Sequence, residues 1–247
     1  MPKLKKIVDD TIQAVEQMKR EGITHVEVTR GTLEELGKAP RAVPVAPRAA
    51  ATSSGVSAAL APIEVQAKAC TKCRELSRTR TNVVFGVGDP HAELMFIGEA
   101  PGRDEDLEGE PFVGRAGELL TKIIQAMGFK RHEVYIANVL KCRPPENRTP
   151  LPDEVVNCLP YLLAQVEAIK PKVIVGLGAT AVKALLDVQL GISKMRGNWY
   201  NFHGIPIMPT FHPAYLLRNP PAKREVWQDM QTVLAKLGRE VPKPAKA

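Results

Sequence analysis

No stretch of this sequence approaches the roughly 18 uninterrupted apolar residues that a membrane-spanning helix requires. The basic start, Met1 to Lys6, is not followed by the apolar core of a secretion signal, and no internal repeat is present. We therefore expect a cytoplasmic protein without a membrane anchor. Cysteine is also scarce, with four in 247 residues. Because thiols stay reduced in the cytoplasm, these cysteines suit metal ligands or catalysts better than disulfides.

The composition is that of a globular protein with a modest basic excess. The hydrophobic fraction is 44% and the charged fraction 25%, both ordinary values. There are 34 Lys and Arg residues against 27 Asp and Glu, a net charge of +7. Such an excess suits a polyanionic partner such as nucleic acid, although many housekeeping enzymes are equally basic. The length allows one domain with a sizeable core, with or without an extension.

The first 62 residues differ in character from the rest. Residues 1–37 are expected to form an extension, with an amphipathic helix over 1–22 and a short strand over 23–29. Residues 38–62 are rich in Pro, Ala and Ser without periodicity, which predicts a flexible linker. The extension either docks a protein partner or the following domain, or is a dispensable appendage. We expect the main domain over 63–238 and a disordered tail over 239–247.

The main domain alternates short apolar runs with helical patterns. Strands are predicted at Leu94–Gly98, Val134–Val139, Val173–Gly176 and Ile205–Thr210, and helices at 114–127, 153–169 and 179–187. This order indicates βαβ units. The predicted fold is therefore α/β, a three-layer α/β/α arrangement around a central, mainly parallel sheet of four strands.

Polar residues follow three of the predicted strands. Ligands of open α/β sheets bind beyond the carboxyl ends of the strands, and Glu99, Asn138 and His212 fall near such ends. A long polar loop over 99–113 follows the first strand and is rich in glycine. The sequence therefore predicts a binding site at this edge of the sheet.

The cysteines are spaced as a possible metal site. Cys70 and Cys73 form a CxxC pair, and Cys142 and Cys158 are separated by a Pro-rich loop and a helical turn. Together they are able to close a four-thiolate site, which suits either structural zinc or a [4Fe–4S] cluster. The spacing does not separate these two options. Four unconnected buried cysteines are the remaining alternative.

Four motifs carry the chemistry. They are Gly98–Asp106 (GEAPGRDED), Gly109–Gly117 (GEPFVGRAG), Tyr135–Pro145 (YIANVLKCRPP) and Phe211–Arg218 (FHPAYLLR). With the CxxC pair, they closely resemble the family 4 uracil-DNA glycosylases, the iron–sulfur branch of that superfamily, from about residue 63 to about residue 237. The resemblance implies a monofunctional enzyme that flips uracil out of single- or double-stranded DNA and hydrolyses its N-glycosidic bond, which starts base excision repair. It also implies a [4Fe–4S] cluster on the four cysteines that takes no part in the chemistry. The sequence gives no oligomeric state, so a monomer, associated with the nucleoid, is the default expectation.

The resemblance assigns roles to individual residues. Phe112 is expected to stack on the flipped base, Asn138 to hydrogen-bond its O4 and N3–H, and His212 to stabilise the negative charge that develops at O2. The uracil-binding set implied is Gly98, Glu99, Ala100, Gly102, Glu105, Phe112, Asn138 and His212. Discrimination against cytosine requires that the Asn138 amide be held in one orientation.

Two positions depart from the better-known uracil glycosylases. Ala100 stands where those enzymes have an Asp that positions water, so Glu99 either orients the attacking water or only shapes the loop. Gly102 stands where they have a Tyr that rejects the methyl group of thymine. We hypothesise that Glu105 fills the space left by Gly102 and excludes thymine.

Leu216 and Arg218 resemble a loop that contacts DNA, with Leu216 as a wedge in the minor groove and Arg218 on phosphate. The alternative is that Leu216 is buried at the start of a helix. Residues 113–122 lack the basic, His-containing insertion of the branch that forms covalent links to DNA, so covalent trapping is disfavoured. Three rival functions remain: an iron–sulfur electron-transfer or redox-sensing protein, a zinc-stapled nucleotide-binding module, and an inactive damaged-base binder.

Overall fold

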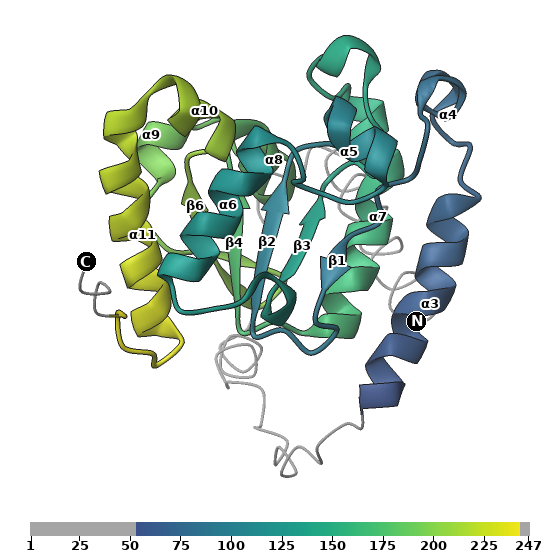
Figure 1. The fold of residues 1–247 in the computed structure, drawn as a ribbon. Helices are drawn as coiled ribbons and strands as arrows, with labels where there is room; N and C mark the ends of the chain where they lie inside the picture. Colours follow the sequence, from purple (N-terminus) through teal and green to yellow (C-terminus); the bar gives the residue numbers. More distant parts are fainter. Residues whose placement is uncertain (1–52, 243–247) are drawn as a thin grey trace, which may run out of the picture. The chain divides into compact units, whose positions relative to one another are not determined.

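A mixed sheet of six strands forms the centre of the computed structural model, which describes residues 53–242 (Figure 1). The strands lie in the order β1-β3-β2-β4-β6-β5. The four inner strands are parallel, whereas β1 and β5 pair antiparallel at the two edges. The strands are β1 Val87–Gly88, β2 Leu94–Gly98, β3 Tyr135–Asn138, β4 Val173–Leu177, β5 Tyr200–Phe202 and β6 Ile205–Thr210.

The four strands predicted from apolar runs are the four inner strands, but the predicted strand number was wrong because both edge strands were missed. β1 has two residues and β5 has three, too few to give a recognisable pattern. β5 and β6 form a hairpin in which Phe202 pairs with Ile205. His203 and Gly204 make its two-residue turn, with positive φ angles of 50° and 84°.

Helices cover both faces of the sheet, which confirms the three-layer α/β/α fold (Figure 1). Leu94 and Phe96 of β2 pack in one core cluster with α6 and α11. Met95 and Ile97 of the same strand pack in the other cluster with α3, α7 and α8. The helices are α3 Ser53–Lys68, α4 Arg74–Thr79, α5 Arg103–Glu108, α6 Arg115–Ala126, α7 Pro152–Ile169, α8 Ala179–Leu186, α9 Ile192–Met195, α10 Pro213–Arg218 and α11 Lys223–Lys236. Three 3₁₀ turns, η1 Arg131–Glu133, η2 Pro145–Asn147 and η3 Pro220–Ala222, complete the described part.

Helix α3 begins at Ser53, inside the predicted linker 38–62. The residues from 53 to 62 are therefore helical, contrary to the prediction of a flexible linker. The physical reason is that alanine favours helix and that Leu60 and Ala67 bury their side chains in the cluster that contains α7. The predicted extension 1–37, the linker residues 38–52 and the end of the predicted tail, 243–247, lie outside the described residues. Within 53–242, no helix is both long and apolar enough to cross a bilayer.

Candidate active site and thiol site

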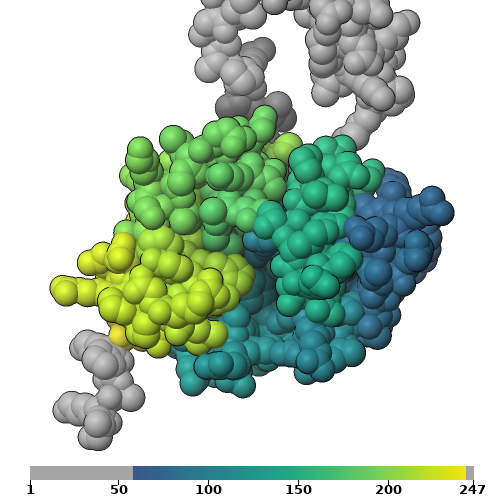
Figure 2. Space-filling view, turned by 90° about the horizontal axis from the view of Figure 1, so that it is seen from above, coloured from purple at the N-terminus to yellow at the C-terminus, as the bar shows by residue number. Residues whose placement is uncertain are grey.

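A pocket of about 540 Å³ lies at the carboxyl ends of the parallel strands, at the predicted edge of the sheet. Figure 2 views this edge and shows a hollow between the yellow-green atoms of α10 and α11 and the teal-green atoms that lead into α7. The pocket is lined by every residue that was predicted to contact the base, except Gly98. The walls are formed by Glu99, Ala100, Gly102, Glu105, Phe112, Ala116, Asn138, Asn147, His212, Ala214, Tyr215 and Arg218.

Gly98 faces the point where Phe112 and Asn138 meet. A Cβ atom at position 98 would lie 2.4 Å from Asn138 Oδ1 and 2.5 Å from Phe112 Cζ. The last residue of β2 must therefore be glycine for the ring and the carboxamide to approach each other. Gly98 thus packs directly beneath two residues of the pocket, although it does not line the pocket itself.

The backbone of Phe112 has a left-handed conformation with φ 56°, which is strained for an aromatic residue. Two residues hold it there. Arg131 donates from Nη2 to the carbonyl oxygens of Pro111 at 2.7 Å and Phe112 at 3.1 Å. Gly117 allows the carbonyl of Phe112 to approach α6, because a Cβ at position 117 would lie 1.8 Å from that oxygen. Strain of this kind is concentrated at functional sites.

Asn138 ends β3 and is buried, with 2% of its surface exposed. Among the described residues, its Oδ1 has no hydrogen-bond partner. Its main-chain oxygen accepts a hydrogen bond of 2.9 Å from Lys141 Nζ. A buried acceptor without a partner costs about 1–3 kcal/mol, so this oxygen is available for a ligand donor.

His212 is held in one tautomer by the helix that follows it. As N-cap of α10, it accepts the backbone N–H of Ala214 on Nδ1 at 3.1 Å. Because Nδ1 is the acceptor, the neutral ring carries its proton on Nε2. Burial, with a smaller effect of the Arg218 guanidinium, lowers the pKa of His212 to about 4. The ring lies 5.6 Å from that of Phe112, centroid to centroid.

Glu105 occupies the space beside Gly102. A Cβ at position 102 would lie 2.6 Å from Glu105 Oε2, and that oxygen accepts the backbone N–H of Gly102 at 3.1 Å. The other oxygen, Oε1, accepts the N–H groups of Val113 and Gly114 at 3.2 and 3.3 Å. One carboxylate thus joins both ends of the segment 102–114 and lines the pocket.

Leu216 does not fit the predicted role of a wedge. It is fully buried in the core cluster with α6 and α11, so it is unable to enter a DNA groove while α10 keeps its place. Tyr215 and Leu217 on the same helix are each 37% exposed. The helical period of α10 turns Leu216 inward and its neighbours outward. Arg218, predicted to contact phosphate, lines the pocket.

The four cysteines line one small internal space of about 20 Å³. The alternative of unconnected cysteines is therefore wrong. Cys142 Sγ accepts a hydrogen bond from Arg80 Nη1, and Cys158 Sγ accepts one from the backbone N–H of Lys141, both at 3.1 Å. Burial raises the pKa of the Cys142 thiol. It also raises the pKa of the Cys158 thiol, to about 12. Within 53–242, no three His, Cys, Asp or Glu side chains are grouped closely enough to hold a single metal ion.

The segment between Cys142 and Cys158 connects this thiol site with the pocket. Asn147 from this segment lines the pocket, and its Oδ1 accepts a hydrogen bond of 2.8 Å from Arg143 Nε. Arg148 binds Glu154 and Glu75, with 2.7 Å from its Nη2 to a carboxylate oxygen of each. The sequence analysis missed Asn147. Its position between Cys142 and Cys158, two predicted cluster ligands, could have indicated that it lies near the site.

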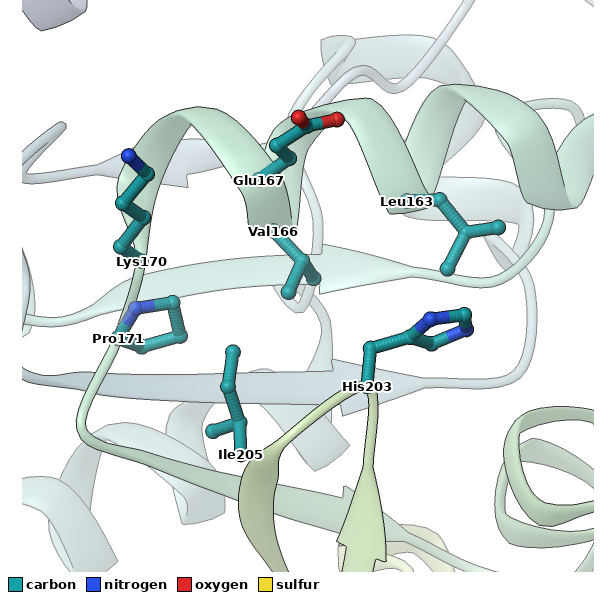
Figure 3. Close-up of a pocket in the computed structure, with 7 residues that line it drawn as sticks. All are labelled: Leu163, Val166, Glu167, Lys170, Pro171, His203 and Ile205. Atoms are coloured by element: carbon teal, nitrogen blue, oxygen red, sulfur yellow. The ribbon is translucent and has the colours of Figure 1, made fainter. Parts of the chain in front are cut away.

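A second hollow of about 540 Å³ lies near the amino ends of β4 and β6 (Figure 3). Leu163 and Val166 of α7 point toward His203 and Ile205 of the β5–β6 hairpin, while Glu167 lies on the far side of the helix in this view. The remaining lining residues are Lys170 and Pro171. None of these was predicted to act in a site, and the hollow lies at the end of the sheet opposite to the first pocket.

Comparison with known proteins agrees with this geometry. The family model described as the uracil DNA glycosylase superfamily matches residues 85–231. A type-4 uracil-DNA glycosylase from Thermotoga maritima is 47% identical over 184 residues, which cover 72% of this chain and 94% of the relative. The chain belongs to the uracil DNA glycosylase superfamily.

Within this superfamily, the chain is more similar to type-4 than to type-5 glycosylases. The type-4 uracil-DNA glycosylase of Pyrobaculum aerophilum is 42% identical over 66% of this chain and 87% of its own length. The type-5 uracil-DNA glycosylase of the same organism is 31% identical over 52% of this chain and 64% of its own length. These relations confirm the predicted family. In this superfamily member, both Phe112 and His212 lie inside the matched residues 85–231, whereas Cys70 and Cys73 precede them.

Proposed function

We propose that this protein excises uracil from DNA by flipping the base into the pocket between Phe112, Asn138 and His212. The observation that carries the proposal is the buried Oδ1 of Asn138, which has no partner among the described residues and lies beside the Phe112 ring. A uracil whose face stacks on that ring would present N3–H, a donor, to this oxygen. Stacking on an aromatic ring is worth about 1–3 kcal/mol per base, which offsets part of the cost of unstacking.

The rate of bond cleavage would depend on His212. Breaking the bond between C1′ and N1 leaves its electron pair on the uracil, with negative charge at O2, and positive charge on the sugar. Neutral His212 would donate its Nε2–H to O2, a hydrogen bond that strengthens as the charge grows. Since Nδ1 already accepts from Ala214, the ring is oriented for this donation before the base arrives.

Glu99 would assist the second part of the reaction. It follows β2 directly and lines the pocket with Ala100, which has no carboxylate of its own. A water molecule oriented by Glu99 would add to C1′ of the sugar, and the proton that it loses would neutralise the uracil anion, which yields free uracil and an abasic site. DNA would lie across the rim of the pocket, where Arg218 is available to contact a phosphate. The exposed Leu217, rather than Leu216, is available to fill the space that the flipped base leaves in the stack.

The residues at the thiol site fit a [4Fe–4S] cluster. The cluster would be held by Cys70, Cys73, Cys142 and Cys158. It would link three segments of the chain and take no part in the reaction. The hydrogen bonds from Arg80 and Lys141 to two of the sulfur atoms suit an anionic cluster. All four thiols line the same small space, and zinc is the alternative occupant of this site.

The decisive experiment measures free uracil released from a duplex that contains one deoxyuridine, with a chelator present. Phe112→Ala and His212→Ala are compared with the wild type, and His203→Ala is the matched control because this histidine lies in the hairpin turn at the other end of the sheet. We expect release by the wild type and the control and a loss of at least about 100-fold in both pocket variants. Absorbance near 400 nm and iron per chain report the cluster. An iron-bearing, folded protein without uracil release would favour electron transfer or damage binding.

A further inference from the structure

Lys141 is a buried cation whose role the proposed chemistry does not explain. Only 1% of its surface is exposed, and it forms no salt bridge with any residue in 53–242. It lies between the two sites described above, because it lines the thiol site and bonds to Asn138 of the base pocket. A lysine at such a place is costly unless its hydrogen-bonding groups are all used.

A small buried network takes up two of the three N–H donors of the Lys141 ammonium group. Nζ donates to the main-chain oxygen of Asn138 at 2.9 Å and to Gln165 Oε1 at 2.6 Å. Gln165 is fully buried, and its Nε2 donates to the oxygen of Phe85 at 3.0 Å and to Tyr135 Oη at 3.1 Å. Because both donors of Gln165 are engaged in this way, its Oε1 must face Lys141. The network therefore fixes the position of Nζ.

The bond from Lys141 fixes the peptide group that follows Asn138. The nitrogen of this peptide belongs to Val139 and donates to the oxygen of Gly98 at 2.9 Å. Its oxygen belongs to Asn138 and accepts from Lys141. With both ends of the peptide held, the backbone of Asn138 is fixed, and with it the direction in which the Cα–Cβ bond leaves the strand. This matters because the carboxamide oxygen itself has no partner among the described residues.

We infer that Lys141 is a positioning residue, which aims the Asn138 carboxamide at the base and ties it to the thiol site. The tie to the thiol site is the backbone N–H of Lys141, which donates to Cys158 Sγ. The inference rests on the proposed role of Asn138 in binding uracil. It accounts for the fixed backbone position from which the Asn138 carboxamide reaches the base.

The test is a double-mutant cycle of Lys141→Met and Asn138→Ala in the iron-bearing protein. Methionine keeps most of the volume of lysine and removes the donor. We expect Lys141→Met to lower the single-turnover rate of uracil release by about 10- to 100-fold, since a small misplacement of a contacting group has effects of this size. In the Asn138→Ala background, the same substitution should have almost no further effect. The affinity for a duplex with a non-cleavable 2′-fluorinated deoxyuridine should fall in parallel.

Lys172→Met is the matched control, because it makes the same change at a lysine just before β4, at the other end of the sheet, whose ammonium group pairs with Glu93. It should keep the wild-type rate. Iron per chain and the absorbance near 400 nm should be unchanged in all variants, because the donor to Cys158 is a main-chain group.

The inference fails if Lys141→Met releases uracil at the wild-type rate, or if its effect is as large in the Asn138→Ala background as alone. It also fails if neither Lys141→Met nor Lys141→Gln folds while Lys172→Met folds normally, since Lys141 then serves stability. The proposed function is tested separately in the same series: if Asn138→Ala itself keeps full activity, the assignment of Asn138 is wrong, whatever Lys141 does.

Discussion

The Nδ1 atom of His212 lies 3.1 Å from the backbone nitrogen of Ala214 and accepts its hydrogen bond. Burial of the ring, with a smaller effect of the Arg218 guanidinium, lowers the pKa of His212 to about 4 and keeps the ring neutral. An unfolded histidine has a pKa of about 6.5, so the unfolded chain binds more protons than the folded protein between these values. The contribution of His212 to folding therefore weakens as the pH falls from about 6.5 to about 4.

We predict that the single-turnover rate does not fall at pH 6.5 and falls only as the pH approaches about 4. The measurement is uracil release from pH 3.5 to pH 8, together with urea unfolding of the wild type and His212→Gln. As the pH falls below about 6.5, the free energy of unfolding of the wild type should decrease relative to that of His212→Gln. A rate profile with its midpoint near 6.5 would show that His212 is not held neutral.

Gly98→Ala should abolish most activity while the fold persists. The new methyl group would lie 2.4 Å from Asn138 Oδ1 and 2.5 Å from Phe112 Cζ, so both side chains must move. We expect a loss of about 100-fold in kcat/KM. Gly191→Ala is the control, because a Cβ there meets no atom within 4 Å. Equal kcat/KM values for the two variants would mean that Phe112 and Asn138 do not act on the base together.

Glu105→Ala should raise the ratio of thymine release to uracil release from mispaired duplexes. It empties the space beside Gly102, where the carboxylate now lies, although overall activity should fall because three backbone N–H groups lose their acceptor. Glu105→Gln fills the same volume and should still reject thymine. The hypothesis that Glu105 excludes thymine is wrong if the Ala variant releases no more thymine than wild type at equal uracil activity.

Arg131→Gln should weaken base binding through the backbone of Phe112. The guanidinium holds two carbonyl oxygens of a segment in which Phe112 has a left-handed conformation, and such a conformation costs about 1–3 kcal/mol without support. We expect roughly a tenfold loss of affinity for DNA with a non-cleavable deoxyuridine analogue. The loss should disappear when Phe112 is replaced by Ala. If Arg131→Gln lowers the affinity equally in the Phe112→Ala background, then Arg131 does not act through Phe112.

The sequence predicted those parts of the structure that depend on local pattern. The runs at Leu94–Gly98 and Ile205–Thr210 became strands with the predicted bounds, because each is buried along its whole length or nearly so. The short strand at Tyr200–Phe202 was missed, since three residues give no period and its pairing partner decides its structure. Motif positions likewise placed Phe112, Asn138 and His212 at one pocket.

The remaining features depend on contacts that only the folded chain makes. Leu216 and Leu217 are adjacent leucines, and only the packing of α10 decides which one is buried. Lys141 precedes a cysteine in the sequence and resembles an ordinary surface charge there. Its burial arises because β3 and α7 bring Asn138 and Gln165 to either side of its ammonium group.

Glu105 accepts hydrogen bonds from both ends of the segment 102–114, and this has a thermodynamic consequence. A wall of the pocket that is already assembled has little conformational entropy left to lose when a base enters. Most of the conformational entropy lost on binding is then lost by the DNA, because the target nucleotide must leave the stack. Association should for this reason show a heat-capacity change set by the buried aromatic and base surfaces, rather than by the folding of a protein loop.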